Sequence, residues 1–327
     1  MEDTFGRKID YIRISVTDRC NLRCKYCMPN GMENVYTCDE IMSYEEILRI
    51  CKNLVAVGIT KFKITGGEPL ARIGIDDFII KLKSMEGVKQ VTLTTNGVLL
   101  DKHLDALKKA GIDGINISLD TLDPKRYEEI TGFNALDKVL SSIDKAYDMG
   151  IKIKINAVPV RQYNINEITK LAAIAKDKNI QIRFIELMPI GFARDLTPIP
   201  NEEILELIEK EFGKSQEYKE ERLVNGPAHY YKFNNFKGKI GLISAVSHKF
   251  CSECNRIRLT SYGDLKLCLC YDYGVNLKDL IRNKKLTDEE LKDVIKKEIL
   301  KKPKQHSFEH MEDEENIENK NMFQIGG

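Results

Sequence analysis

Histidine is scarce in this chain of 327 residues, which contains only five. The five form no H-E-x-x-H segment or other paired set of metal ligands. We expect surface or locally satisfied roles for all of them: His103, His229, His248, His306 and His310. A G-x4-G-K-[ST] segment is also absent, which excludes a P-loop nucleotide-binding protein.

Long apolar runs and an excess of either charge are missing as well. No apolar run approaches the roughly 20 residues that a membrane-spanning helix needs. The N-terminal segment MEDTFGRKIDYIRI lacks the basic and then apolar pattern of a secretory signal, so we expect a cytoplasmic protein without membrane contact. The formal net charge of +1 argues against a protein-wide nucleic-acid surface, so an anionic ligand would have to meet a local group of Lys and Arg side chains.

Cysteine, in contrast, is abundant for a reducing compartment, where disulfides rarely persist. Two of the nine cysteines, Cys38 and Cys51, stand apart. The others form two groups with short internal spacing: Cys20, Cys24 and Cys27, then Cys251, Cys254, Cys268 and Cys270. Such grouping favours metal coordination over disulfides.

Short β-rich runs alternate with amphipathic helical patterns from residue 11 to about residue 190. Several of the helical patterns end at Gly, as helix C-caps often do. Six βα units in series predict an α/β fold with a parallel sheet, either open or curled into a barrel. The strand candidates are 11–17, 61–65, 90–95, 114–119, 151–158 and 180–187.

The pattern changes after the segment MPIG at 188–191. A helix is expected at 201–212, hairpin-like strands around 228–233 and 239–245, and a Lys- and Glu-rich helix near 287–301. The end of the chain is acidic and polar until its final residues, which predicts a mobile tail. We therefore expect a core at 1–190, a smaller α+β region at 191–310 that closes the core, and a tail at 311–327.

Polar and apolar side chains alternate along the predicted strands. Because successive side chains point to opposite faces, Arg13 falls opposite Ile12 and Ile14, and Arg183 falls opposite Ile182. If the apolar face meets the helices, the other face is a polar, cationic lumen. Unpaired buried cations cost several kcal/mol each, so we expect a polyanionic ligand there. The alternative is that all six strands are edge-like and face water, but six edge strands cannot coexist in one sheet. The other lumen positions are Lys61, Lys63, Thr65, Thr92, Thr94, Asn116, Ser118, Lys152, Lys154 and Asn156.

The first cysteine group has the spacing C-x3-C-x2-C, within DRCNLRCKYCMPNG at 18–31. Three cysteines cannot fill a tetrahedral zinc site, and the first histidine is as distant as His103. A [4Fe–4S] cluster held by three thiolates would leave one iron open for a small molecule. A zinc site completed by a remote ligand is the alternative.

The second cysteine group combines C-x2-C with C-x-C, in CSECNRIRLTSYGDLKLCLC. A four-thiolate zinc ribbon would fit this spacing. Against it, Arg256 and Arg258 alternate on the strand-like segment NRIRLT and add two cations beside the thiols.

These motifs resemble those of a known superfamily of enzymes. C-x3-C-x2-C with Tyr26 before its last cysteine, after the first strand, resembles the radical S-adenosylmethionine superfamily. TGGEP at 65–69 is similar to the glycine-rich adenosylmethionine motif of that superfamily: Gly66 and Gly67 allow close approach of a ligand, and Glu68 suits a cationic amino group. The ordered set from IRISVTDRCNLRCKYCMP through ITGGEPL, TTNGVLL, INISLD, RFIELMPIG and CSECNRIRLT to the closing IGG resembles one family within it, the GTP 3′,8-cyclases of molybdenum cofactor biosynthesis.

The resemblance implies an incomplete (β/α)6 barrel of the TIM type and a C-terminal region that carries a second cluster. By similarity, Cys20, Cys24 and Cys27 hold a first [4Fe–4S] cluster, and Cys251, Cys254 and Cys268 hold a second. The positions that match adenosylmethionine contacts are Tyr26, Gly67, Ser118 and Met188. The positions that match GTP contacts or further lumen cations are Arg13, Lys61, Lys63, Thr94, Lys154, Arg183, Arg256, Ile257 and Arg258. The last two residues, Gly326 and Gly327, match a tail that enters the active site, where they join Arg256 and Arg258 as catalytic residues.

Two positions depart from the family pattern. Lys63 stands where the family favours Arg, which keeps the charge but loses the bidentate fork. Cys270 follows Cys268 where the family more often has an aromatic residue. A fourth protein ligand would close the open iron of the second cluster, so we interpret Cys270 as a strand neighbour that points away.

The implied reaction uses an external electron donor and adenosylmethionine to make a 5′-deoxyadenosyl radical, which removes hydrogen from C3′ of GTP. The carbon radical then attacks guanine C8 and is reduced to 3′,8-cyclo-7,8-dihydro-GTP, which the resemblance implies passes to a cyclic pyranopterin monophosphate synthase. The sequence does not distinguish a monomer from a homodimer. Two alternatives are another radical adenosylmethionine enzyme with an auxiliary cluster, such as a peptide-modifying enzyme, and a zinc-containing nucleic-acid-binding protein.

Overall fold

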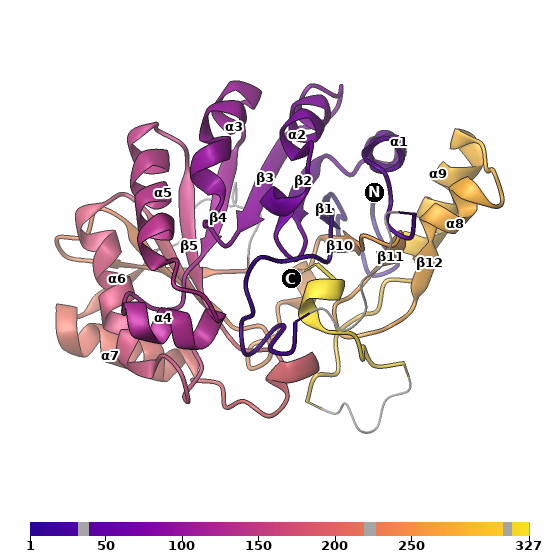
Figure 1. Cartoon of the computed structure of the whole chain (residues 1–327). Helices are drawn as coiled ribbons and strands as arrows, with labels where there is room; N and C mark the ends of the chain where they lie inside the picture. Colours follow the sequence, from indigo (N-terminus) through magenta and orange to yellow (C-terminus); the bar gives the residue numbers. More distant parts are fainter. Residues whose placement is uncertain (32–38, 219–226, 310–315, 327) are drawn as a thin grey trace.

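The computed structural model describes residues 1–31, 39–218, 227–309 and 316–326 (Figure 1). Six parallel strands lie side by side in chain order, as the βα alternation predicts. They are β1 (Tyr11–Ser15), β2 (Lys61–Thr65), β3 (Gln90–Thr95), β4 (Gly114–Ser118), β5 (Ile153–Ala157) and β6 (Gln181–Ile185). The helices between them are α1 (Tyr44–Ala56), α2 (Ile75–Lys83), α3 (Leu104–Ala110), α4 (Pro124–Thr131), α5 (Leu136–Asp148) and α6 (Ile168–Asp177).

The C-terminal region extends the same sheet at both of its edges. β10 (Arg256–Leu259) pairs in parallel with β1, and β9 (Lys239–Ile243) pairs in parallel with β6. Antiparallel strands complete the two edges: β11 (Asp264–Lys266) and β12 (Gly274–Asn276) beyond β10, and β8 (His229–Phe233) and β7 (Ser215–Tyr218) beyond β9. We expected a smaller α+β region that closes the core; its strands join the core sheet, which has 12 strands in the described part of the chain.

The remaining helices flank these edges. α7 (Asn201–Phe212) follows β6 in the chain, while α8 (Leu277–Arg282) and α9 (Asp288–Ile299) lie together beyond β11 and β12 (Figure 1). The Lys- and Glu-rich helix predicted near 287–301 is α9, which begins with a capping box between Thr287 and Glu290. One side of it is buried through Leu291 and Ile295, so only its other side is a solvated face.

The core lies between the strands and the surrounding helices. Ile12, Ile14, Phe62, Ile64 and Phe184 expose none of their surface and pack with the apolar sides of the helices. These are the apolar positions of the alternating strands, so the polar positions point to the opposite, inner face. This arrangement places Arg13, Lys63 and Arg183 inside the curved sheet. Lys152, which we also expected there, precedes β5 and is exposed.

The end of the chain packs against the body of the protein. Ile317 bridges to Tyr271, and Glu318 and Ile325 are almost fully buried. The short 3-10 helix η7 (Met322–Gln324) lies beneath the strands (Figure 1). We expected a tail at 311–327 that is mobile before its end enters the active site; residues 316–326 are packed, and residues 310–315 and 327 lie outside the described part of the chain. Among the described residues, no helix combines the length and apolar character that crossing a membrane requires.

Candidate active site

Two adjoining cavities occupy the inner face of the sheet. The first cavity is lined by Cys20, Cys24 and Cys27, and the second by Cys251, Cys254 and Cys268. They contain about 1330 Å³ and 1100 Å³ of space free of protein atoms, with their open mouths included. The residues that line both cavities are Arg13, Thr94, Asn156, Ile185, Met188 and Arg258. The two cysteine sets therefore face one continuous interior.

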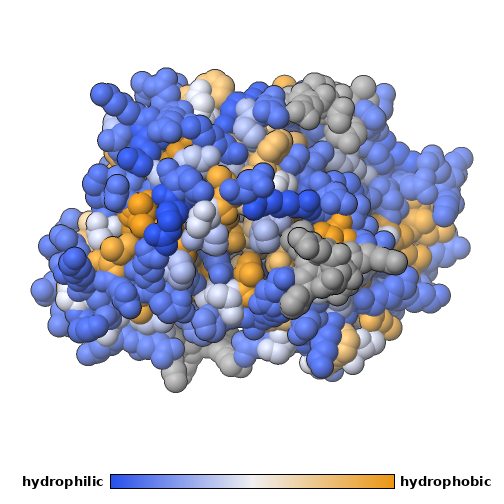
Figure 2. Space-filling view, turned by 90° about the horizontal axis from the view of Figure 1, so that it is seen from below, coloured by the Kyte–Doolittle hydropathy of each residue, from blue (hydrophilic) through white to orange (hydrophobic). Residues whose placement is uncertain are grey.

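Figure 2 looks from below at the side where the loop after β1 and η7 lie. Apolar residues gather near the middle of this face, with hydrophilic ones around them.

The first cysteine set lies on the loop that follows β1. The N–H groups of Cys27 and Met28 both donate to the Cys24 carbonyl, at 2.9 and 2.8 Å, which turns the chain tightly between the second and third cysteine. Burial raises the pKa of the Cys20 thiol to about 11 and that of the Cys27 thiol to about 12. Three such thiols are costly as thiolates unless a cation compensates them.

The donor set of the first cavity fits an iron–sulfur cluster. All three thiols are soft donors, and none of them forms a disulfide. The Cys20 sulfur accepts hydrogen bonds from the Leu22 N–H at 3.4 Å and the Asn96 side chain at 3.8 Å, the kind of contact that tunes cluster sulfurs. Over the described residues, no group of three or more His, Cys, Asp or Glu side chains could hold a single metal ion; the fit to a cluster rests on the three thiols.

The TGGEP segment after β2 packs directly on the cysteine loop. The Gly67 N–H donates to the Thr17 carbonyl at 2.7 Å, and the Glu68 N–H donates to the Arg19 carbonyl at 2.8 Å. A Cβ at Gly66 or Gly67 would collide with the backbone of Thr17 or Arg19. The two glycines line the first cavity, but the group that approaches them most closely is the backbone of the cysteine loop itself.

Glu68 has a different place from the one expected for it. Its carboxylate accepts hydrogen bonds from the Leu70 N–H at 3.0 Å, the Thr95 hydroxyl at 2.7 Å and the Asn96 N–H at 2.7 Å. Burial outweighs these bonds and raises its pKa to about 7. Glu68 is not among the described residues that line the first cavity. It joins the ends of β2 and β3 beneath the cysteine loop, so our expectation that it meets a cationic amino group is not supported.

A tyrosine–aspartate pair forms another wall of the first cavity. The Tyr26 hydroxyl donates to Asp120 at 2.5 Å, and the Val158 N–H donates to the other carboxylate oxygen at 2.8 Å. Burial raises the pKa of Asp120, with the bonds from Tyr26 and Val158 acting against it. Gly67, Ser118 and Met188 line the same cavity, so the predicted adenosylmethionine positions lie together around the first cysteine set.

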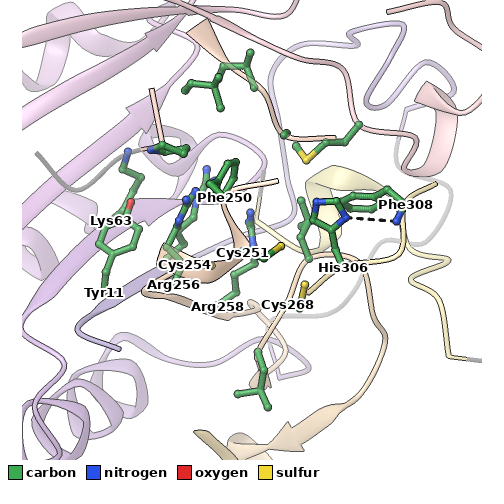
Figure 3. Close-up of a pocket in the computed structure, with 18 of the residues that line it drawn as sticks. Tyr11, Lys63, Phe250, Cys251, Cys254, Arg256, Arg258, Cys268, His306 and Phe308 are labelled. Atoms are coloured by element: carbon green, nitrogen blue, oxygen red, sulfur yellow. Dashed lines mark hydrogen bonds between the residues drawn. The ribbon is translucent and has the colours of Figure 1, made fainter. Parts of the chain in front are cut away.

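The second cysteine set is held by cations from distant parts of the chain. Arg7 donates to the Cys251 carbonyl at 2.9 Å, and Lys302 donates to the Arg256 carbonyl at 2.8 Å. Burial by itself would raise the pKa of Cys254, but the charges of Lys302, Arg256 and Arg7 outweigh it and lower the pKa. Burial raises the pKa of Cys268, with Lys302 acting against it. The three thiols face the same cavity (Figure 3), and the surrounding cations favour the anionic form at Cys254.

Cys270 lies apart from these three thiols. It is fully buried in a small apolar cluster with Ile190, Tyr271 and Ile325, and it is not among the described residues that line the second cavity. Cys268 and Cys270 lie in the irregular segment after β11, not on a strand. Our interpretation of Cys270 as a strand neighbour was therefore wrong about the strand, although its side chain does lie away from the cavity.

A row of basic side chains crosses the sheet between the two cysteine sets. In the strand register, Arg13 of β1 pairs with Arg258 of β10 on one side and with Lys63 of β2 on the other. Neighbouring strands are about 4.8 Å apart, and like charges directly opposite each other destabilise a sheet. We call Arg258, Arg13 and Lys63 the cationic row. All three line the second cavity.

The electrostatic cost of the cationic row appears in its pKa values. Burial, followed by the charges of Arg183, Arg13, Lys154 and Arg256, holds the pKa of Lys63 well below its usual range. Burial and the charges of Arg13 and Arg256 lower the pKa of Arg258 in the same way. The site therefore favours a ligand with several negative charges.

Amide side chains position another cation beside the row. Arg183 donates to Asn156 at 2.9 Å and to Asn116 at 2.6 Å, and Asn116 in turn donates to Thr94 at 3.4 Å. None of these partners is a carboxylate, so these hydrogen bonds leave the positive charge of Arg183 available to the second cavity. Arg256 lies over the Phe250 ring at 4.6 Å in the same cavity.

The packed tail reaches the boundary between the two cavities. Arg258 donates a hydrogen bond to the Gly326 carbonyl, and Met322 and Phe323 line the first cavity. Gly326 has a left-handed backbone, with φ at 76°, and lies against Ser15 and Thr65. Gly327 lies outside the described residues.

Two family models match the chain. The model of the Radical SAM superfamily matches residues 14–175, which include the first cysteine set. The model of Molybdenum Cofactor Synthesis C matches residues 180–308, which include the second.

Relatives with a named activity match over the whole chain. A protein of Clostridium perfringens (strain 13 / Type A) named GTP 3′,8-cyclase is 46% identical over 327 residues, which are 100% of this chain and 100% of the relative. A protein of Alkaliphilus oremlandii (strain OhILAs) with the same name is 42% identical over 337 residues and again covers 100% of both chains. The chain belongs to the GTP 3′,8-cyclase family. Its membership in the wider Radical SAM superfamily implies a [4Fe–4S] cluster and adenosylmethionine.

Solved structures outside the GTP 3′,8-cyclase family share the fold. Streptococcus suis SuiB bound to the precursor peptide SuiA has a TM-score of 0.65 at 16% identity, covering 98% of this chain and 76% of that one. SuiB bound to S-adenosylmethionine has a TM-score of 0.62 at 17% identity, covering 83% of this chain and 63% of that one, so this chain spans less than two thirds of its length. At such identities the likeness shows the fold alone, a parallel sheet curved into a partial barrel.

Three residues expected to contact GTP are not in the cavities. The Lys61 ammonium forms an ion pair with Asp10 at 2.9 Å, at the start of β2. Lys154 stands on β5 beside Asn116, near enough for its charge to act on Lys63, but it is not among the described residues that line either cavity. The Ile257 side chain is buried in the core on the helix side of β10, so only its backbone faces Arg256 and Arg258.

Other residues of the site were not predicted from the sequence. The second cavity also contains Lys302 and His306, and the first contains Asp120. We expected a surface or satisfied role for His306, but it is 6% exposed and its Nε2 atom has no hydrogen-bond partner in the described structure. Nothing in the local pattern marks this histidine, because it reaches the cavity through contacts with residues far away in the chain.

Proposed function

We propose that this chain converts GTP to 3′,8-cyclo-7,8-dihydro-GTP, the first step of molybdenum cofactor biosynthesis. The single observation that carries the proposal is the cationic row, which lines a cavity shared with two sets of three cysteines. A triphosphate would offset the repulsion among Arg258, Arg13 and Lys63, which are neighbours in the strand register. The names of the full-length relatives support the same reaction.

In this proposal, Cys20, Cys24 and Cys27 hold a [4Fe–4S] cluster, and adenosylmethionine binds beside it against Tyr26, Gly67, Ser118 and Met188. When bound, the cluster and adenosylmethionine supply the radical that removes hydrogen from C3′ of GTP. The Tyr26–Asp120 bond fixes one wall of this cavity. Met322 and Phe323 from the tail cover another part and exclude water from it.

Cys251, Cys254 and Cys268 are proposed to hold a second [4Fe–4S] cluster with one iron left for the guanine base. The donor set fits, because three thiols line the cavity and Cys270 lies elsewhere. Arg7 and Lys302 hold the loops of this set and place positive charge near its sulfurs.

GTP would then lie across the second cavity with its triphosphate on the cationic row. The further proposed GTP contacts are Thr94, Arg183, Arg256 and the Ile257 backbone; Lys61 and Lys154 would act only at longer range. Gly326 accepts a hydrogen bond from Arg258, so the tail orients a guanidinium that binds the substrate. Gly327 is proposed to follow it into the site.

Several finer assignments belong to the same proposal. The core at 1–190 would be an incomplete (β/α)6 barrel that the region 191–310 closes. An external reductant supplies electrons, and a cyclic pyranopterin monophosphate synthase receives the product. The cytoplasmic location remains a prediction from the sequence, and nothing distinguishes a monomer from a homodimer.

A peptide-modifying enzyme is the less favoured function. It would use the same first cavity, but a neutral peptide does not compensate the cationic row. The zinc-containing nucleic-acid-binding protein is excluded by the membership of the chain in the GTP 3′,8-cyclase family.

The test is GTP-dependent formation of 5′-deoxyadenosine by anaerobically reconstituted protein with a reductant. We expect about eight iron and eight sulfide atoms per chain, from two four-iron clusters, and 5′-deoxyadenosine only when GTP is present. The double variant Arg256→Ala/Arg258→Ala should lose this dependence while keeping its iron. Equal 5′-deoxyadenosine with and without GTP in the unaltered enzyme would contradict the proposal.

A further inference from the structure

A histidine without an assigned role lines the cavity of the second cysteine set. His306 is 6% exposed and lies in the same cavity as Cys251, Cys254 and Cys268. Figure 3 shows it beside Cys268 and Phe308, across the cavity from Lys63 and Tyr11. Its ring packs against that of Phe308, with centroids 4.8 Å apart, which fixes the plane of the imidazole.

The hydrogen bonding of His306 determines which of its nitrogens carries a proton. The Phe308 N–H donates to Nδ1 at 3.5 Å, so Nδ1 is the acceptor. In a neutral imidazole the other nitrogen is then the donor. Burial and the charge of Lys249 lower the pKa of His306, with the Ala245 backbone acting against them, and the neutral form is favoured.

The donor nitrogen is buried and has no partner with hydrogen-bond geometry among the described residues, although the Ala245 backbone is near enough to the ring to raise its pKa. Nε2 makes no hydrogen bond within the described structure, and a buried N–H without an acceptor costs roughly 1–3 kcal/mol. The nitrogen without a dashed bond points toward the middle of the cavity in Figure 3. A ligand that offers an acceptor at this point would remove that cost.

We propose that His306 is a specificity-determining residue whose Nε2–H donates to O6 of the guanine base. This inference rests on the proposed function, in which the base lies by the second cysteine set and the triphosphate lies on the cationic row. Guanine presents a carbonyl oxygen at position 6, whereas adenine presents an amino group. A fixed N–H donor therefore accepts GTP and rejects ATP, because two donors would face each other.

The test measures nucleotide binding without turnover. Reconstituted enzyme is kept anaerobic and without a reductant, and its dissociation constants for GTP and ATP are measured by equilibrium dialysis. His306→Leu and His306→Phe both remove the donor, and the second also fills the space of the ring. His306→Gln keeps an N–H donor, and His248→Gln is a control at an exposed histidine of the neighbouring loop.

We expect both donor-less variants to bind GTP about tenfold more weakly, the size of one lost hydrogen bond, and to bind ATP at least as tightly as the unaltered enzyme does, because the two donors no longer face each other. 7-Deaza-GTP keeps O6, so its affinity should fall by the same factor in both donor-less variants. His306→Gln should stay within about threefold of the unaltered enzyme, and His248→Gln should not change. The absorption and iron content of each variant report whether its clusters remain.

Three results would overturn the proposal: an unchanged GTP affinity in both donor-less variants, an equal loss for both nucleotides, or a loss for GTP that 7-deaza-GTP does not share. Each of these leaves the proposed reaction intact, because the unaltered enzyme still binds GTP. Failure of the unaltered, iron-loaded enzyme to bind GTP would instead contradict the proposed function itself.

Discussion

At the scale of single residues, the cationic row lowers the stability of the folded protein without ligand and allows it to bind an anion. Arg258, Arg13 and Lys63 are neighbours across three strands, and burial lowers the pKa of each. A protein without a ligand would be more stable if one of these charges were replaced by an apolar side chain of similar length. The row is therefore best explained by an anionic ligand that it must bind.

The variant Lys63→Met tests whether the row lowers stability and promotes GTP binding. Without nucleotide, the variant should unfold at an equal or higher temperature than the unaltered protein, because a buried, repelled charge is gone. It should bind GTP at least tenfold more weakly, since a charge-assisted bond contributes about 1.5–3 kcal/mol. Thermal unfolding with and without GTP measures both effects.

Lys61→Met is the matched control, because it changes the same residue type two positions earlier on the same strand. Lys61 is paired with Asp10 outside the cavities. Its loss should lower stability slightly and leave GTP affinity within about twofold. A Lys63→Met variant that resembles this control in both measurements would contradict the role given to the row.

Alternation along the strands was enough to predict Arg13, Lys63 and Arg183 as inward-facing cations. It could not separate Lys61 from them, because Lys61 pairs with Asp10, which lies just before the start of the neighbouring strand β1. His306 could not be predicted either. Its role depends on a fold that carries the segment after α9 back to the second cysteine set.

At the scale of elements, the tail is held by a buried ion pair. Lys266 of β11 pairs with Glu318, and both side chains are at most 2% exposed. The Glu318 N–H donates to the Cys270 carbonyl at 2.9 Å, and its own carbonyl accepts from Arg194 at 3.0 Å. The strands of the C-terminal region thus position the segment that brings Gly326 to Arg258.

Glu318→Gln should release the tail. Breaking one side of a buried pair leaves the other charge poorly compensated and costs roughly 3–5 kcal/mol, although Asp272 remains 3.2 Å from Lys266. We expect faster hydrogen exchange in 316–326 and at least a tenfold lower turnover, with both clusters retained. Hydrogen exchange measured by mass spectrometry tests the release of the tail directly.

Lys320→Gln provides a comparison in the same segment. Lys320 pairs with Asp272 at 3.2 Å but is 37% exposed, so its loss should change exchange little. If Glu318→Gln exchanges no faster than Lys320→Gln, the buried pair does not hold the tail.

A second ion pair connects α1 to α8 and makes their contact sensitive to acid. Arg282 donates to both carboxylate oxygens of Glu46, at 2.6 and 2.8 Å. This bond is the largest cause of the lowered pKa of Glu46, despite partial burial. A carboxyl group with a lowered pKa in the folded state contributes stability above its ordinary value of 4.5, and this contribution is lost as the pH falls through the lowered pKa.

Glu46→Gln should therefore lower the free energy of unfolding by about 1 kcal/mol at pH 7 and by much less near pH 3. Thermal unfolding of both proteins as a function of pH measures the difference. A difference that stays constant from pH 7 to pH 3 would show that the charge of Glu46 is not its source.

Most helices and strands could be predicted, because their apolar residues recur at the spacing of a helix or a strand. The ends of some helices also carry caps, such as Ser43 and Thr287. The joining of the C-terminal strands to the core sheet could not. β9 pairs with β6, and β10 pairs with β1 across a gap of more than two hundred residues, and no local pattern specifies such partners. The ion pair that holds the tail could not be predicted for a similar reason, since the partner of Glu318 is a buried lysine on a distant strand.

At the scale of the whole molecule, one curved sheet brings two sets of three cysteines to the same interior. The loop after β1 supplies one set and the segments around β10 and β11 supply the other. Between them lie the cationic row and the end of the tail. The cavities share Arg13, Thr94 and Met188, so a substrate bound on the row can face both sets.

The central claim is that a group formed in the first cavity reacts with GTP held in the second. The most direct measurement uses GTP that carries deuterium at C3′, with unlabelled adenosylmethionine and a reductant. We predict that the 5′-deoxyadenosine formed contains deuterium. Steady formation of 5′-deoxyadenosine that contains no deuterium, in the presence of this GTP, would contradict the account.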